Sequence, residues 1–385
     1  MGLNYKKLGG FIRTVDERNS DLAITNLQGV SITKEFIPSI ANIIGTDLST
    51  YKIVRTGQFA YGPVTSRNGD KVSIALLKGD DCIISSSYMP FEVYKPDELL
   101  PEYLMLWFMR PEFDRYARFM SNGSAREVFD WDCMCGVELP VPSIDEQRKI
   151  VHDYQVITDR ILLLSRINDN LFQQTTAYFK ELFEDAGFKS DSITDIDSRP
   201  VEKLSSYVSF AQGTQVPVEN QLLSNEIDDR NNYVRFIRIV DYTTKQQEPP
   251  RFIKLNNNQC YCSSDDIVMV RYGNVGLVGR GIEGVIANNM FKIIPHTPLT
   301  NNYLYYYLTQ PLVYEYIVAS CGGSAMPSIK HSTIGDLSIK LPSAELLTKF
   351  DVFAASTEKT IRINEKEIVL LRNESSMLLA QFLNR

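Results

Sequence analysis

Two Cys-x-Cys pairs are the clearest candidates for metal chemistry in this sequence. Cys133 and Cys135 form one pair, and Cys260 and Cys262 form the other. Structural zinc sites usually space their thiolates as Cys-x₂₋₄-Cys, whereas a spacing of two in a strand places both thiols on one face. Free cysteines are also among the most frequently buried residues. The spacing therefore predicts small buried thiols and no metal site.

Three short segments have a superficial similarity to parts of enzyme active sites. "EPPR" (248–251) is similar to the amine-binding loop of DNA amino-methyltransferases, but it lacks the aromatic residue that stacks on the target base. "GNVGLVG" (273–279) is not followed by a helical pattern, so turns in a β-rich unit are the better interpretation. "PDEL" (96–99) is not followed by the Glu-x-Lys of a nuclease, and no Gly-x₄-Gly-Lys-Ser/Thr phosphate loop occurs. The sequence therefore predicts no catalytic residue and no enzymatic activity of its own.

Composition and charge are those of an ordinary folded chain. Its 385 residues are 44% apolar and 23% charged, which is enough for two or three domains with real cores. No apolar run reaches the length of a membrane span, and the N-terminal stretch lacks a signal-like apolar core. We therefore expect a cytoplasmic protein with no membrane partner. The net charge of −7 argues against a protein that coats nucleic acid by bulk charge.

The elements that must position any functional group occur twice along the chain. Identical residues lie 200 positions apart at Tyr103-Leu104 and Tyr303-Leu304, Pro111 and Pro311, Tyr116 and Tyr316, "GSA" 123–125 and 323–325, Pro142-Ser143 and Pro342-Ser343, Lys149 and Lys349, and Leu171 and Leu371. Such a constant interval indicates an internal repeat. Upstream the interval changes, because "YKKLGGFI" (5–12) is similar to "VEKLSSYV" (201–208) at a distance of 196. Each half therefore has a variable, strand-rich front and a constant back.

Each half ends in a long predicted helix. Ser143 and Glu146 form a capping box for the first helix, and Leu346 weakens the equivalent cap of the second. Both helices carry a heptad seam, and Asn364 is a polar interruption in the second. The seam residues are Ile150, Tyr154, Ile157, Ile161, Leu164, Asn168, Leu171, Tyr178 and Leu182, and then Ile361, Ile368, Leu371, Leu378 and Phe382. Each helix would be roughly 50–60 Å long at 1.5 Å per residue, so we expect the two helices to cover each other.

These patterns predict an α+β fold with five segments. They are a first β-rich α/β domain (1–142), a first long helix (143–185), a polar linker (186–200), a second β-rich α/β domain (201–342) and a second long helix (343–385).

The joint between domain and helix carries a resemblance to a known family. Its sequence is "LPVPSIDEQRKIV" (139–151), and "KLPSAELLTKFD" (340–351) repeats it without the Glu-Gln pair. Segments of the variable fronts also look like recognition domains of that family: "YKIVRTGQFAYG" (51–62), "CIISSSYMPFEVY" (82–94), "YVRFIRIVDYTT" (233–244), "DIVMVRYGNVG" (266–276) and "ANNMFKIIP" (287–295). Over essentially its whole length, the chain resembles the specificity subunits of type I restriction–modification systems.

The resemblance implies a non-catalytic DNA-recognition subunit. An antiparallel two-helix coiled coil would separate two target-recognition domains, each reading one half of an interrupted, asymmetric site in double-stranded DNA. The family's partners are two modification subunits that methylate adenine with S-adenosylmethionine, together with restriction/translocase subunits that use ATP and Mg. The resemblance implies no cofactor in this chain itself.

Candidate DNA contacts follow from the chemistry of base recognition. Arg or Lys recognises guanine, Asn or Gln recognises adenine, and small hydroxyl groups contact either. In the first half the candidates are Arg55, Gln58, Tyr61, Ser66, Arg67, Asn68, Ser86, Tyr88, Ser124 and Arg126. In the second half they are Gln212, Thr214, Gln215, Arg238, Arg271, Tyr272, Asn274, Asn288, Asn289, Ser324 and Lys330. Because the fronts differ, we expect two different half-sites; because the chain is acidic, we expect its DNA binding alone to be weak and sensitive to salt.

Two other functions stay open at this point. A coiled-coil scaffold whose variable domains bind proteins would be insensitive to competition by a bipartite duplex. A self-contained methyltransferase would bind S-adenosylmethionine by itself. The repeat also predicts that a fragment ending near Asp185 pairs with its own copy and recognises a symmetric site.

Overall fold

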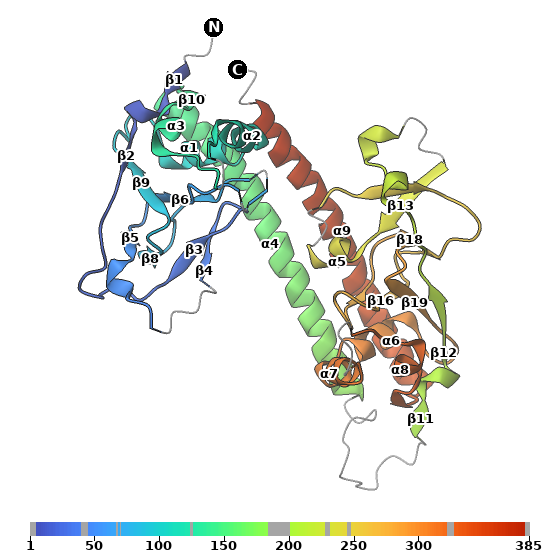
Figure 1. Cartoon of the computed structure of the whole chain (residues 1–385). Helices are drawn as coiled ribbons and strands as arrows, with labels where there is room; N and C mark the ends of the chain where they lie inside the picture. Colours follow the sequence, from blue (N-terminus) through green and yellow to red (C-terminus); the bar gives the residue numbers. More distant parts are fainter. Residues whose placement is uncertain are drawn as a thin grey trace. The chain divides into compact units, whose positions relative to one another are not determined.

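The computed structural model describes residues 5–39, 45–66, 68–69, 71–123, 126–183, 201–227, 232–244, 248–321 and 327–381. They form two compact units, the first comprising Met1–Leu163 and Glu367–Arg385 and the second Leu164–Lys366. Figure 1 shows α4 (Ile144–Phe183) and α9 (Ala344–Gln381) as two continuous helices, and each contributes residues to both units. The five-segment division predicted above stays a prediction, and its linker (186–200) lies outside the described residues.

The first unit is built on a four-stranded antiparallel sheet of order β2-β9-β6-β7. Two further antiparallel pairs, β3 with β4 and β5 with β8, complete its variable part. Its strands are β1 (Tyr5–Lys7), β2 (Ile12–Thr14), β3 (Gln28–Val30), β4 (Phe36–Pro38), β5 (Lys52–Val54), β6 (Phe59–Tyr61), β7 (Ile74–Leu76), β8 (Cys82–Ile84), β9 (Met89–Val93) and β10 (Glu138–Pro140). Its short helices are α1 (Pro101–Phe108), α2 (Pro111–Met120) and α3 (Trp131–Cys135).

Aromatic side chains form the centre of the first core. The rings of Phe59 and Phe91 stack at 4.8 Å, and Phe108 meets Phe59 edge-on at 5.9 Å. Every residue of β6, β7 and β8 is buried, so these strands contain no alternating polar positions. Strands covered on both faces lose the period-2 pattern that would reveal them in a sequence.

The second unit repeats this sheet with the order β12-β19-β16-β17. Its variable part differs, because β14, β13, β18 and β15 form one sheet in which β13 and β18 are parallel. Its strands are β11 (Val201–Lys203), β12 (Val208–Gln212), β13 (Tyr233–Ile237), β14 (Arg251–Lys254), β15 (Tyr261–Cys262), β16 (Ile267–Val270), β17 (Val278–Gly279), β18 (Gly284–Ile286), β19 (Met290–Pro295) and β20 (Ser338–Lys340). Its short helices are α5 (Ile239–Thr243), α6 (Asn301–Leu308), α7 (Pro311–Ala319) and α8 (His331–Gly335).

The internal repeat predicted from the sequence is present in the fold. In the first unit, β1 pairs with β10 so that Tyr5 lies opposite Pro140. In the second, β11 pairs with β20 so that Val201 lies opposite Lys340. These partners are related by the intervals of 196 and 200 found in the sequence. The two halves therefore share a framework and differ in the strands inserted into it.

The two long helices pair side by side in an antiparallel coiled coil, as predicted. Within the second unit, Thr175 lies against Thr357 with their hydroxyl oxygens 3.0 Å apart, and Asn168 is hydrogen-bonded to Asn364. Within the first unit, Arg160 donates to Glu367 over 2.8 Å. Increasing numbers on α4 meet decreasing numbers on α9, which is the antiparallel arrangement.

The start of α4 confirms the predicted capping box. The backbone N–H of Ser143 donates to Glu146 at 3.1 Å, and the N–H of Glu146 donates back to the Ser143 hydroxyl at 3.4 Å. At the start of α9 the N–H of Leu346 donates to the Ser343 hydroxyl at 3.3 Å, and the apolar Leu346 side chain cannot return a hydrogen bond. Within the described part of the chain, no helix has the length and apolarity needed to cross a membrane.

Candidate nucleic-acid interface

Most of the predicted DNA contacts lie at one end of each repeated sheet. In the second unit, the end of β12 and the end of β16 meet the beginning of β19, with Gln212 opposite Phe291 and Val270 opposite Met290. In the first unit, the end of β6 likewise meets the beginning of β9, with Tyr61 opposite Met89. The loops that leave and enter these strands are therefore neighbours, and we call each set a loop face.

The second loop face consists of Gln212, Thr214, Arg238, Arg271, Tyr272, Asn274, Asn288, Asn289 and Lys330. Hydrogen bonds to backbone carbonyls hold its segments together. Gln212 Nε2 donates to the carbonyls of Asn288 at 2.7 Å and Met290 at 3.1 Å. The N–H of Arg271 donates to the carbonyl of Asn289 at 2.8 Å, and the carbonyl of Arg271 accepts from Ile329 at 2.9 Å. Residues from four separate parts of the sequence thus form one surface.

Close backbone approach fixes Thr214 in this surface. Its N–H donates to the carbonyl of Ile286 at 2.8 Å, and its hydroxyl oxygen accepts from the N–H of Cys260 at 3.0 Å. The preceding Gly213 makes this possible, because a Cβ there would lie 2.1 Å from the carbonyl oxygen of Ala287. Gly213 therefore has a packing role that no other residue could fill.

The cationic side chains of the second loop face differ in whether a carboxylate already pairs with them. Arg238 is occupied, because its Nε lies 3.3 Å from the buried carboxylate of Asp241 and its Nη2 donates to the Pro249 carbonyl at 3.0 Å. Arg271 and Lys330 have no carboxylate partner within the described ranges, and Lys330 is exposed. These two cations are the ones free to meet phosphate or guanine.

The remaining members of this face are turn residues. Asn288 and Asn289 form a turn that is closed by the N–H of Met290 donating to the Ala287 carbonyl at 3.0 Å. Asn274 is exposed and Tyr272 is half-buried on the turn after β16. Gln215 follows Thr214 directly and is also exposed.

His331 supports the second loop face and was missed in the sequence. Its ring stacks on Phe210 with centroids 4.8 Å apart and meets Phe291 at 4.7 Å. Burial is the main cause that lowers the pKa of His331, and the nearby positive charge of Arg271 lowers it further. A usable signal existed, because the residue 200 positions earlier is Trp131, which packs on Phe91 at 5.7 Å.

The first loop face contains Ser66, Asn68, Ser86, Tyr88 and Arg126. The loop after β6 is joined to the segment before α3, because the N–H of Thr65 donates to the Glu127 carbonyl at 3.0 Å. Tyr88 packs beside Gly62, where a Cβ would lie 3.5 Å from its ring. Ser66, Ser86 and Arg126 are exposed. Arg67, Ser124 and Ser324 lie outside the described residues.

Tyr61 belongs to the core and not to the loop face. Its side chain is 0% exposed, and its hydroxyl contacts Met89 Sδ at 3.5 Å. Burial raises the pKa of the Tyr61 hydroxyl. A ring enclosed by Phe91 and Phe129 leaves no face for a base, which corrects the sequence-based assignment.

Arg55 and Gln58 lie at the opposite end of β6, outside the first loop face. Arg55 forms ion pairs with Glu17 and Asp81, the latter at 2.7 Å. The hydrogen bond to Glu17 is the main cause that raises the pKa of Arg55, and the hydrogen bond to Asp81 raises it further. Gln58 accepts from the N–H of Arg55 at 2.8 Å and donates to Glu92 at 2.9 Å. Both residues stabilise a turn, and carboxylates already satisfy their polar groups.

The cysteine pairs differ from each other. Cys133 and Cys135 lie on helix α3 and not on a strand, whereas Cys260 precedes β15 and Cys262 lies within it. Burial raises the pKa of Cys135 and, together with Asp130, that of Cys133. No group of three metal-ligating side chains occurs in the described ranges of the chain.

Comparison with known proteins agrees with this geometry. Residues 216–368 match the family described as "Type I restriction modification DNA specificity domain". The chain is therefore similar to type I specificity subunits. It is 23% identical over 303 residues to the type I restriction enzyme MjaIX specificity subunit of Methanocaldococcus jannaschii, covering 74% of this chain and 68% of that protein. It is 22% identical over 453 aligned positions to the HindI specificity subunit of Haemophilus influenzae, covering 98% of each.

A solved structure shares the fold of this chain. The S subunit of a type I restriction–modification system from M. genitalium aligns with a TM-score of 0.58 at 14% identity. The alignment covers 99% of this chain and 96% of that one. The fold class predicted from the sequence is thereby confirmed.

Proposed function

We propose that this chain is the DNA-recognition subunit of a type I restriction–modification complex and that its two loop faces read two different half-sites. One observation carries the proposal. The repeated sheets present equivalent strand ends, yet the residues on those ends differ: Arg271 lies beside Asn289 in one unit, whereas Tyr61 lies opposite Met89 at the corresponding place in the other. Equivalent frameworks with unlike contact groups are what an asymmetric, interrupted site requires.

Chemistry supports base recognition by the second loop face. Arg271 carries a guanidinium with no carboxylate partner in the described ranges, and a guanidinium can bond both O6 and N7 of guanine. Lys330 is exposed on an adjacent segment and suits a phosphate contact. Asn274 offers an amide that suits adenine.

The paired helices are proposed to set the distance between the two half-sites. α4 has 40 residues and α9 has 38. Helices of that length extend about 60 Å, compared with about 34 Å for one turn of DNA. A stiff pair of helices would therefore fix the spacer length of the recognised site.

Catalysis is proposed to belong entirely to partner subunits. Two modification subunits would supply S-adenosylmethionine and methylate adenine, and restriction/translocase subunits would use ATP and Mg. The absence of a phosphate loop and of a complete methyltransferase motif from this sequence supports that division.

Methylome sequencing tests the proposal directly. A host that expresses the modification subunits is sequenced with and without this chain, and methylated adenines are mapped. A new interrupted, asymmetric motif is the expected result. If methylation is unchanged and a protein ligand is retained by the variable domains, the chain is a scaffold instead.

A further inference from the structure

A polar cleft in the second unit lies away from the loop face. Its volume is about 660 Å³, and its lining residues are Asp265, Asn301, Asn302, Ala355, Glu358, Lys359, Arg362, Ile363 and Lys366. Asp265 precedes β16 and Arg271 follows it, so the cleft and the loop face are at opposite ends of that strand. DNA held on the loop face therefore does not account for the cleft.

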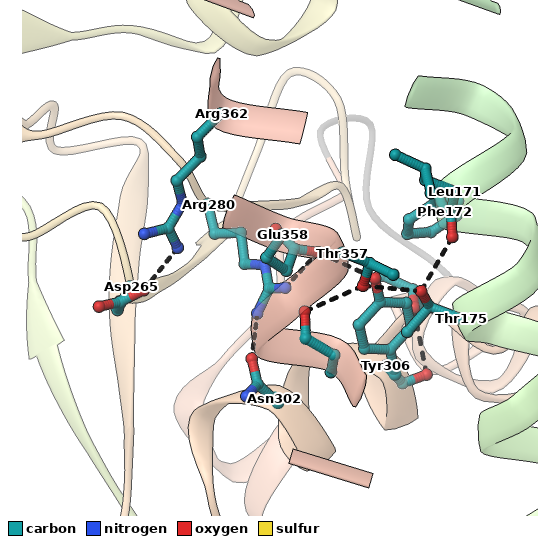
Figure 2. Close-up of polar contacts among 12 residues, drawn as sticks. Leu171, Phe172, Thr175, Asp265, Arg280, Asn302, Tyr306, Thr357, Glu358 and Arg362 are labelled. Carbon is teal, nitrogen blue, oxygen red and sulfur yellow. Dashed lines mark hydrogen bonds and ion pairs between the residues drawn. The ribbon is translucent and has the colours of Figure 1, made fainter. Parts of the chain in front are cut away.

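The carboxylates of the cleft are already neutralised. Asp265 Oδ1 lies 2.5 Å from Arg362 Nη2, and Glu358 forms an ion pair with Arg280 (Figure 2). Lys359 and Lys366 are exposed and have no ion partner in the described part of the chain. The lining therefore keeps two uncompensated positive charges.

Two arginines hold the polar groups of the cleft in place. The Arg280 side chain is 4% exposed, its guanidinium covers the Tyr305 ring at 4.1 Å, and its Nη1 donates to Asn302 at 3.1 Å. Arg280 supports Glu358 and Asn302 without lining the cleft itself, whereas Arg362 lines it, and the buried Nε of Arg362 has no hydrogen-bond partner in the described ranges. Figure 2 shows Arg280 between Glu358 and Asn302, with Arg362 directed toward Asp265. The unsatisfied donor and the free cations together favour a ligand rich in acceptor oxygens.

The first half of the repeat does not contain the residues for such a cleft. The positions 200 earlier than Lys359, Arg362 and Asn302 are Asp159, Leu162 and Glu102, whereas Lys366 has a cationic counterpart in Arg166. Of the first three counterparts, two are acidic and the third is apolar. A partner that binds the cleft would therefore distinguish the two halves of an otherwise repeated molecule.

We propose that this cleft binds an acidic segment of a protein partner, through two carboxylates that reach Lys359 and Lys366. The two lysines are seven positions apart on α9, a rise of about 10 Å. In a peptide with polyproline II conformation, residues three apart lie on one face and are separated by about 9 Å, so a Glu-x-x-Glu segment matches the spacing. A concave site takes a projecting side chain more readily than the convex backbone of a duplex, which favours protein over DNA.

Peptide binding to the full chain tests the proposal. The probe is a fluorescent 12-residue peptide of four Glu-Ser-Ser repeats, and the comparison peptide has four Gln-Ser-Ser repeats. Anisotropy at low ionic strength should show binding of the glutamate peptide alone. The double variant Lys359→Glu/Lys366→Glu should weaken it about tenfold or more, since two exposed ion pairs become repulsive.

A control double variant and a DNA competitor decide whether peptide binding depends on the cleft. Lys149→Glu/Lys349→Glu changes two exposed lysines of the long helices outside the cleft and should alter binding less than about twofold. Equal losses in both double variants, or no peptide binding, would overturn the proposal. Competition by duplex DNA that depends on Lys359 and Lys366 would also overturn it, by assigning the cleft to phosphates. Unchanged circular dichroism and melting temperature show that a variant is folded.

The same preparations separate this inference from the proposed function. Binding of a bipartite duplex by the Lys359→Glu/Lys366→Glu variant should match the unchanged chain. If the chain binds the peptide but shows no sequence-specific DNA binding, the proposed DNA recognition is contradicted and the cleft inference is not. If DNA binding is intact but the chain does not distinguish the glutamate peptide from the glutamine peptide, the cleft inference is contradicted and the proposed DNA recognition is not.

Discussion

Asn364 donates a hydrogen bond from Nδ2 to Oδ1 of Asn168 over 2.7 Å, within the seam between α9 and α4. Asn168 in turn donates to the carbonyl of Ile361 at 3.5 Å. Apolar residues such as Leu164 and Ile368 are buried along the same seam. A polar pair in an apolar seam selects one register at some cost in stability. The two residues are 196 positions apart, so they are not repeat equivalents.

Replacing Asn364 alone should destabilise the helix pair. Asn364→Leu leaves Oδ1 of the half-buried Asn168 without its donor, and we expect a loss of about 1–3 kcal/mol in the free energy of unfolding. Asn168→Leu/Asn364→Leu removes both amides and should recover most of that loss. Urea unfolding of the two single variants and the double variant measures the coupling. Strictly additive changes would refute the paired role.

The buried contacts of Glu358 should be worth more than those of any surface pair. Glu358 accepts from the Tyr306 hydroxyl at 2.9 Å and pairs with Arg280. Glu358→Gln leaves the arginine charge uncompensated, so we expect a loss of about 3–5 kcal/mol. Tyr306→Phe removes one hydrogen bond and should cost about 1 kcal/mol. Denaturant unfolding checks both, and a loss for Glu358→Gln below that of Tyr306→Phe would refute the expected order.

His331 should make the second unit less stable in acid. Burial lowers the pKa of His331 in the folded chain below its ordinary value of 6.5. The unfolded state therefore binds this proton more readily, so the stabilisation is present above about pH 6.5 and is lost as the pH falls through the lowered pKa. His331→Phe keeps the aromatic contact with Phe210 and removes the titration. The variant should lose less stability than the unchanged chain between pH 8 and pH 5.5, measured by urea unfolding; parallel curves would exclude this role.

Arg271 should contribute to DNA binding, and Arg55 should not. Arg271→Ala is expected to cost about 1–3 kcal/mol in affinity for the cognate duplex and to relax the preference at one base pair. Arg55 is held by Glu17 and Asp81 at the other end of β6, so Arg55→Ala should change affinity by less than about 0.5 kcal/mol. Gel-shift titration of the assembled complex with cognate and single-substituted duplexes gives both values. Equal losses of DNA affinity in the two variants would indicate that Arg55 also contacts DNA.

A fragment ending near Asp185 should form a dimer. In the whole chain, Leu378 and Leu379 pack against the core of the first unit. The residues 200 earlier are Tyr178 and Phe179, so a second copy of the fragment can supply apolar side chains at these positions. Analytical ultracentrifugation should show dimers, and the dimer should prefer a symmetric site. Monomers across a wide concentration range would count against the helix pairing as its cause.

Local sequence was sufficient for the repeat and for the long helices. The interval of 200 identified equivalent elements, and Ser143 with Glu146 marked the start of α4. Capping and heptad periodicity depend on residues within a turn or two of one another, so they can be recognised in the sequence alone. The acidic net charge and the missing catalytic motifs are likewise properties of the sequence.

Only the tertiary structure decided which side chains are free to act. Tyr61 is enclosed by the core and Tyr272 lies on a turn, although both precede a glycine. Arg55 and Arg271 both follow short apolar strands, yet only Arg55 meets two carboxylates. The register that joins Asn168 to Asn364 and the cleft beside Lys359 also depend on contacts between distant segments. Packing across such separations determines burial and charge pairing, and no local pattern records it.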